Sequence, residues 1–179
     1  IQMRGYPKNV MAQRNLSEQM DDEVVDMLLS EVERAYPIYA RYLKAKAKML
    51  GLESDFSIWD TGAPIGHSDK DFTFEEAYNL HLSVMKDFDK DFHDYSIRMI
   101  EEERIDAFPR KGKRGGAFAS YRKGDESFVL LNFTGKLRDV STISHELGHA
   151  IHGHLSQVQE APVYDSPLSM AETASIFSE

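Results

Sequence analysis

The chain has 179 residues, 41% hydrophobic and 28% charged, which is enough to bury a core as one domain or as part of one. Its formal charge of −9 argues against a nucleic-acid partner, because phosphate binding needs a basic face. Without cysteine it has neither disulfides nor thiolate zinc ligands, which fits a reducing compartment. No apolar run approaches ~18 residues. We therefore expect a cytoplasmic protein with no membrane segment.

Residues 1–107 are expected to be mainly helical. From Asp21 to Leu50, apolar residues recur at steps of three and four, with acidic residues at the start and lysines near the end. Gly51 follows and suits a helix C-cap. Pro37 should kink or divide this helix, because proline lacks the amide proton and clashes with the preceding turn.

A long connection is expected over residues 52–72, and a second helical region opens at Thr73. Glu76 stands three residues later and predicts a capping box. The acidic and aromatic alternation over 87–94 indicates a break between two helices.

Three histidines, His67, His81 and His93, are isolated in the sequence. His81 falls on the apolar stripe of the second helical region. We interpret these residues as structural, interface or exposed histidines rather than metal ligands, because a lone histidine carries no ligand spacing.

Two strands are predicted over 115–121 and 127–133, with the turn sequence Lys-Gly-Asp at 123–125 between them. This arrangement predicts an antiparallel hairpin. The small residues at 115–117 would let another backbone approach the first strand closely, although a bulge or tight packing explains them equally well. The basic run at 110–114 is too short for a nucleic-acid patch.

The next helix should end near Gly153. It has three candidate N-terminal caps, Asp139, Ser141 and Thr142. Its buried side is predicted to consist of Ile143, Leu147, Ala150 and Ile151. A further helix over 169–179 places Glu172 and Glu179 two turns apart on one side.

His145, Glu146 and His149 form a His-Glu-x-x-His motif on the first of these helices. Two histidines at positions i and i+4 project from one face and can bind one metal ion, while the adjacent glutamate can reach a metal-activated water. The motif therefore predicts a zinc hydrolase with Glu146 as general base.

Catalytic zinc needs a third protein ligand and one open position. His152 shares the stripe of the first two histidines but points too nearly parallel to them, and His154 is rotated away. Glu160 follows the helix too closely to return easily. We predict Glu172 as the third ligand, and Glu179 as the group that orients a histidine ligand.

The tetrahedral intermediate of peptide hydrolysis also needs a hydrogen-bond donor for its oxyanion. Tyr121 and Tyr164 are the possible donors in this sequence, but we interpret both as structural side chains. We expect the donor to lie downstream of Glu179.

The sequence His-Glu-Leu-Gly-His-Ala-Ile-His at 145–152, followed by Met-Ala-Glu-Thr-Ala-Ser-Ile-Phe-Ser-Glu at 170–179, resembles the thimet oligopeptidase/oligoendopeptidase F family, and is nearer to the oligoendopeptidase F branch. The similarity extends upstream through 112–118 and 128–133. Ser178 is one departure, because asparagine is common there in that branch.

This resemblance implies a mostly α-helical, two-lobed peptidase with a deep channel for short peptides. It implies zinc on His145, His149 and Glu172. It further implies that the strand around Gly116, Ala117 and Phe118 pairs with the substrate backbone by β-addition. Tyrosine and histidine donors to the transition state follow the third ligand in the family pattern, beyond this sequence.

Together these observations predict a mainly α fold with a small antiparallel β-sheet, as part of a zincin (gluzincin-like) metallopeptidase. We expect residues 1–179 to be part of a single catalytic domain, helical over 1–107 and with the hairpin and zinc helix over 108–179. Both ends look truncated, so the isolated fragment should cleave poorly. The predicted activity is zinc-dependent endopeptidase cleavage of oligopeptides, with one Zn²⁺ per chain. The alternative is an inactive zinc- or peptide-binding homologue, against which the intact Glu146 argues.

Overall fold

The computed structural model describes residues 5, 11–52, 54–66 and 70–179. The chain divides into two compact units, Ile1–Asp69 and Lys70–Glu179. The prediction for His67 lies outside the described residues. Within the described ranges, no helix combines the length and the apolar character that a membrane crossing requires.

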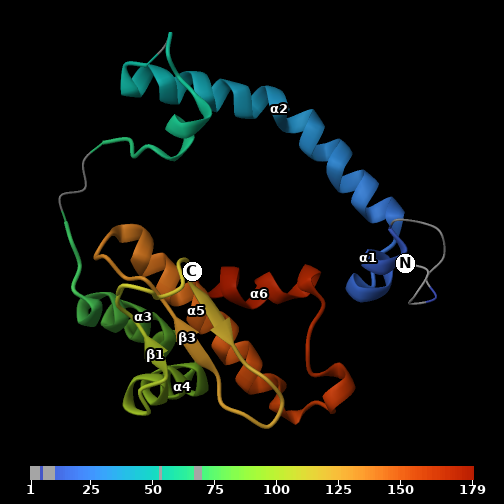
Figure 1. Ribbon diagram of the computed structural model, residues 1–179, viewed down its shortest axis with the longest axis vertical. Coiled ribbons are helices and arrows are strands. Elements are labelled where there is room, and N and C mark those ends of the chain that lie inside the picture. The colour runs from blue at the N-terminus through green and yellow to red at the C-terminus, as the bar shows by residue number, and fades with distance from the viewer. Residues whose placement is uncertain (1–4, 6–10, 53, 67–69) are drawn as a thin grey trace. The chain divides into compact units, whose positions relative to one another are not determined.

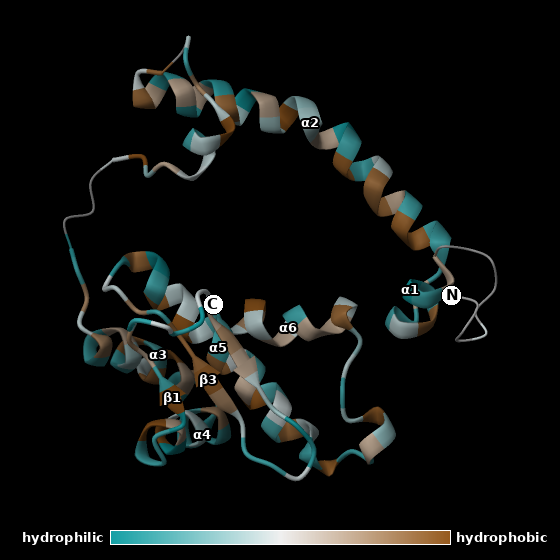
Figure 2. Cartoon of the chain, in the orientation of Figure 1, coloured by the Kyte–Doolittle hydropathy of each residue, from teal (hydrophilic) through white to brown (hydrophobic). Residues whose placement is uncertain are grey.

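The N-terminal unit contains α1 (Ala12–Glu18), α2 (Asp22–Leu50) and a 3-10 turn, η2 (Ile58–Gly62). The predicted C-cap is confirmed, since Gly51 has φ of 69° and its N–H bonds to carbonyls of the last turn of α2. Pro37 does not divide the helix, and Figure 1 shows α2 as one continuous, curved ribbon. Figure 2 shows both hydrophobic and hydrophilic residues along α2.

The C-terminal unit begins with α3 (Phe74–Phe88) and α4 (Lys90–Glu101). The capping box is confirmed: Glu76 N–H donates to Thr73 Oγ1 over 3.1 Å, and Thr73 N–H donates to Glu76 Oε2 over 2.8 Å. The predicted break is also confirmed. Asp89 ends α3 and caps α4, because its Oδ1 accepts hydrogen bonds from the amides of Asp91 and Phe92.

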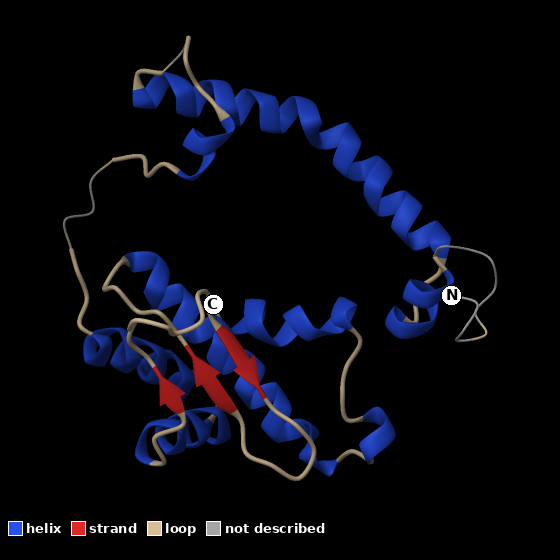
Figure 3. Ribbon diagram, in the orientation of Figure 1, coloured by secondary structure: helices blue, strands red, loops and turns tan. Residues whose placement is uncertain are grey.

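The sheet contains β1 (Ile105–Asp106), β2 (Phe118–Ser120) and β3 (Phe128–Leu130) in the order β1-β3-β2. The hairpin is confirmed, since β2 and β3 pair antiparallel. The prediction of an antiparallel sheet was wrong, because β1 pairs parallel with β3 and the sheet is mixed (Figure 3). A strand of two residues shows no readable alternation, and its partner β3 is the second strand of the hairpin, so β2 lies between them in the sequence.

Helix α5 (Leu137–Leu155) starts before the predicted caps and continues past the predicted end. Asp139 caps it from inside the first turn, where its Oδ2 accepts the Lys136 N–H over 3.1 Å and the Thr134 N–H over 2.8 Å. The prediction that Gly153 ends the helix was wrong. A Cβ at Gly153 would lie 2.4 Å from Tyr121 Cγ, so this glycine makes room for an aromatic ring.

Helix α5 packs against α3, α4, the sheet and α6 (Leu168–Ser178). Between α5 and α6 lie two 3-10 turns, η3 (Ser156–Val158) and η4 (Ala161–Val163). The buried side of α5 is confirmed as Ile143, Leu147, Ala150 and Ile151. These side chains join one core with residues of α3, α4 and β3. Each large apolar side chain buried there contributes roughly 1.5–3 kcal/mol, so the position of α5 is well anchored from behind.

Candidate metal centre

Side chains from two helices converge in front of α5. His145 and His149 lie one turn apart on α5, and Glu172 comes from α6. One ligand atom from each of the three side chains lies within 4.8 Å of the other two. The chain of 22 residues between His149 and Glu172 therefore returns to the motif, as the sequence predicts.

The geometry within this group suits a small cation. His145 Nε2 lies 3.2 Å from Glu172 Oε2, and His149 Nε2 lies 3.4 Å from the same oxygen. The two imidazole rings are 4.9 Å apart and nearly perpendicular, at 84°. Two imidazole nitrogens and one carboxylate oxygen are a ligand set of catalytic zinc, which leaves one position open. The residues present fit Zn²⁺.

Two further groups hold these candidate ligands in place. Glu179 Oε1 lies 2.6 Å from His145 Nδ1, which favours the tautomer that leaves Nε2 free to bind a metal. The Ser175 hydroxyl donates to Glu172 Oε2 over 2.7 Å. This bond, with the two histidines, lowers the pKa of Glu172, so the carboxylate is anionic at neutral pH.

Glu146 lies beside the cluster but is buried, with 6% of its surface exposed. Burial raises the pKa of Glu146, opposed by the nearby His145 and by a hydrogen bond from the backbone of Ala119. Its Oε2 is buried and has no hydrogen-bond partner among the described residues. A desolvated carboxylate with a free oxygen is suited to accept a proton.

The glycine inside the motif explains how α6 comes so close. A Cβ at Gly148 would lie 2.6 Å from the Ala174 carbonyl oxygen and 2.6 Å from Ser178 Oγ. The glycine therefore allows α6 to cross directly against α5, which brings Glu172 within reach of the histidines.

Strand β2 is an edge of the sheet, because among the described strands it pairs only with β3. A cavity of 530 Å³ touches Gly116 and Ala117, and a second of 560 Å³ touches Ala117 and Phe118. Both cavities also reach His145 and Glu146. His145, His149 and Glu172 thus border hollows that follow one free strand edge.

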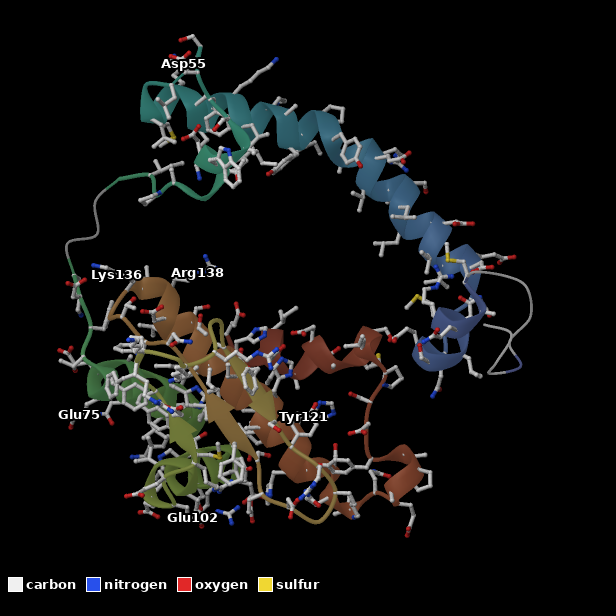
Figure 4. The ribbon with its side chains drawn as sticks, in the orientation of Figure 1. Asp55, Glu75, Glu102, Tyr121, Lys136 and Arg138 are labelled. Carbon is white, nitrogen blue, oxygen red and sulfur yellow. The ribbon has the colours of Figure 1, made fainter. Side chains whose placement is uncertain are left out.

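Asn132 and Arg138 also line the first of these cavities, and no motif in the sequence indicates them. The Asn132 amide donates to the Arg114 and Gly116 carbonyls over 2.9 and 2.8 Å, and so fixes the backbone that enters β2. Gly116 has φ of 81°, which an L-residue rarely adopts. Arg138, labelled in Figure 4 near the start of α5, lines the same cavity as Asn132. A polar residue that interrupts the apolar run 128–133 was the available signal for Asn132.

The two tyrosines considered as oxyanion donors differ in position. The Tyr164 hydroxyl donates to the Gly153 carbonyl over 3.1 Å, which gives this side chain a structural role. Tyr121, labelled in Figure 4, lies against α5 and lines the second cavity with His149 and Glu172. Burial raises the pKa of Tyr121, so its hydroxyl is protonated at neutral pH.

The remaining described histidines lie outside the metal cluster. The His154 ring stacks on Tyr95, with centroids 4.2 Å apart. His81 is 2% exposed and hydrogen-bonded at both nitrogens, which confirms its interpretation as a core histidine. His93 bonds to its neighbouring aspartate, and His152 faces a separate cavity between α5 and α6.

A helix-borne His-Glu-x-x-His pair completed by a glutamate from a following helix is characteristic of metallopeptidases with a His₂Glu ligand set. Comparison with known sequences gives the family. Residues 2–179 match peptidase family M3, and the chain belongs to that family. The prediction of the oligoendopeptidase F branch is confirmed by the relatives described next.

The chain is 30% identical over 179 residues to chromosomal oligoendopeptidase F of Lactococcus lactis subsp. cremoris, covering 99% of this chain and 29% of that protein. It is 32% identical over 159 residues to group B oligopeptidase PepB of Streptococcus agalactiae, and this match covers 88% of this chain and 26% of that protein. Among solved structures, PZ peptidase A with a bound inhibitor matches with a TM-score of 0.76 at 23% identity, over 88% of this chain and 29% of that one. The chain therefore has the helical fold of these peptidases and spans less than a third of their length.

Proposed function

We propose that the intact protein is a zinc-dependent metalloendopeptidase that hydrolyses peptide bonds in short oligopeptides. The observation that carries the proposal is the convergence of His145, His149 and Glu172 within 4.8 Å, beside the buried Glu146. Membership of peptidase family M3 supports the reaction class.

One Zn²⁺ per chain, held by His145, His149 and Glu172, would supply a Lewis acid that polarises the scissile carbonyl and activates a water. Glu146 accepts the proton of the attacking water and passes it to the leaving amine. Its desolvated position suits both transfers, because a raised pKa makes the carboxylate a better base. Glu179 keeps the His145 ring in its orientation through Nδ1.

The substrate backbone pairs with the free edge of the sheet at Gly116, Ala117 and Phe118. The hollows on both sides of Glu146 offer room on either side of the scissile bond, as an endopeptidase needs. The names of the relatives, oligoendopeptidase and oligopeptidase, support short peptides as substrates. We further propose that both units belong to a single catalytic domain with a gluzincin-like fold, in a cytoplasmic protein.

The test is a titration of the metal-free intact protein with zinc, followed by an assay with quenched fluorescent oligopeptides. We expect one equivalent of zinc to bind and to restore cleavage. His149→Ala should lose tight zinc binding, because it removes a ligand. The matched control is His154→Ala, which removes a histidine from the same helix outside the cluster and should bind zinc normally.

Equal zinc binding by the two alanine variants would contradict the ligand assignment. Zinc binding without cleavage of any peptide in the set would instead favour the inactive homologue.

A further inference from the structure

A buried histidine joins three helices behind the metal centre. His81 of α3 is 2% exposed, and its ring bonds on both sides. Its Nδ1 lies 3.1 Å from Ser144 Oγ of α5, and its Nε2 lies 3.1 Å from Ser96 Oγ of α4. Ser144 immediately precedes the ligand His145 in the sequence.

The direction of these hydrogen bonds follows from the donors available. The Ser96 hydroxyl has one proton and donates it to the Phe92 carbonyl over 2.9 Å. Ser96 Oγ therefore accepts from His81, and Nε2 carries the ring proton. Burial lowers the pKa of His81 to about 4, so the ring is neutral at pH 7 and Nδ1 is an acceptor. Ser144 must then donate to His81, and the order runs from Ser144 through His81 to Ser96.

These hydrogen bonds fix the rotation of α5 about its own axis as well as its position. Successive side chains on a helix point about 100° apart. Ser144 is therefore bonded to His81 of α3, while His145, one step of about 100° further round the helix, lies against Glu172 and Glu179. The apolar contacts behind α5 are non-directional, whereas a hydrogen bond has a preferred angle.

A small rotation of α5 would matter for the metal centre. Side-chain atoms lie roughly 5–6 Å from a helix axis, so a rotation of about 10° moves them by about 1 Å. A displacement of that size is enough to cost about 10²-fold in catalysis.

We propose that His81 is a positioning residue for the metal centre, which sets the rotation of α5 through Ser144 and so aims His145 and Glu146 toward Glu172. The inference rests on the proposed zinc peptidase function. It assigns to His81 a role beyond filling the core, although the residue touches neither ligand nor substrate.

Two substitutions separate the two bonds of His81. In His81→Gln the amide nitrogen replaces Nε2, so the bond to Ser96 is kept and the bond to Ser144 is lost. In His81→Asn the amide oxygen replaces Nδ1, so the bond to Ser144 is kept. The readouts in the intact protein are the zinc dissociation constant from chelator competition, and kcat and KM with a quenched fluorescent oligopeptide.

We expect His81→Gln to weaken zinc binding by about 10-fold and to lower kcat by about 10- to 100-fold, with KM unchanged. His81→Asn should recover most of both losses. Ser144→Ala should reproduce the effect of His81→Gln, and combining the two should add no further loss, because both remove the same bond.

The control for a merely structural effect is Tyr78→Phe. It removes the bond from the Tyr78 hydroxyl to the Ser96 carbonyl, 2.7 Å long, in the same buried network, and neither partner of this bond belongs to α5. We expect a lower melting temperature and an unchanged zinc dissociation constant. The positioning role alone would be overturned if Tyr78→Phe and His81→Gln weakened zinc binding equally. Normal zinc binding and kcat in His81→Gln would also overturn it. A wild-type protein that binds no zinc would overturn the proposed function itself.

Discussion

Helix α5 has a polar, partly open face toward α6 and an apolar, sealed face toward α3, α4 and the sheet. On the polar face the side chains of His145 and His149 are 26% and 15% exposed, and their contacts are ionic or hydrogen-bonded. On the sealed face Ile143 and Leu147 are 1% and 0% exposed. Neighbouring residues of one helix thus carry the proposed chemistry and the packing of the core, and substitutions should affect one without the other.

The largest effect is expected for Glu146→Gln, on the proposed peptide hydrolysis. The amide has nearly the same shape but cannot accept the water proton, so kcat should fall by about 10²–10⁴-fold. Zinc content and unfolding free energy should be retained, because Glu146 lies outside the candidate group of His145, His149 and Glu172. Steady-state kinetics and metal analysis of the intact protein test this, and full turnover would refute the role of Glu146 as base.

Leu147→Ala, one residue later, should lower stability and leave the metal site intact. Leu147 is fully buried, so its truncation leaves a cavity and should lower the unfolding free energy by about 2–5 kcal/mol. Zinc affinity of the folded protein should be retained. Denaturant unfolding and chelator competition measure the two quantities. A loss of zinc binding that exceeds the loss of stability would show that the two faces are not separable.

A buried histidine on the sealed side should make the unfolding free energy depend on pH. The pKa of His81 is lowered by burial from 6.5 to about 4. Between these values the unfolded chain binds more protons than the folded one, so stability falls as the pH falls. This contribution should reach about 3 kcal/mol at pH 4, at about 1.4 kcal/mol for each pKa unit. Urea unfolding of the wild type and of His81→Asn from pH 7 to pH 4 isolates it, and parallel curves would contradict the prediction.

Much of the helical fold could be predicted because its causes are local. The periodicity of α2, the capping box of Thr73 and the break at Asp89 depend on residues within a turn or two. The convergence of His145, His149 and Glu172 could also be predicted, because the spacing of the two histidines defines a face and leaves few carboxylates that can return to it. The motif's own glycine permits that return, although its contact with α6 could not be foreseen.

What could not be predicted depends on contacts between distant segments. Strand β1 has two residues and pairs with β3, the second strand of the hairpin, so its parallel register has no local signal. Gly153 has the position of a helix terminator but serves to accept the Tyr121 ring. Asn132 bonds to backbone on a neighbouring segment, which no spacing rule indicates. Each of these residues acts through a neighbour that only the folded chain supplies.

The smallest effect is expected from the same glycine-to-alanine substitution at two positions of α5. This pair should also distinguish most clearly between an effect on zinc affinity and an effect on stability. In Gly148→Ala the new Cβ would meet the Ala174 carbonyl at 2.6 Å, and in Gly153→Ala it would meet the Tyr121 ring at 2.4 Å. In both variants the higher helix propensity of alanine stabilises the fold by about 1 kcal/mol, and overpacking destabilises it by about 1–3 kcal/mol. Only Gly148→Ala pushes away the helix that bears Glu172, so it alone should weaken zinc binding in chelator competition. Equal zinc affinities in the two variants would mean that the close crossing of α5 and α6 is not what holds the third ligand in place.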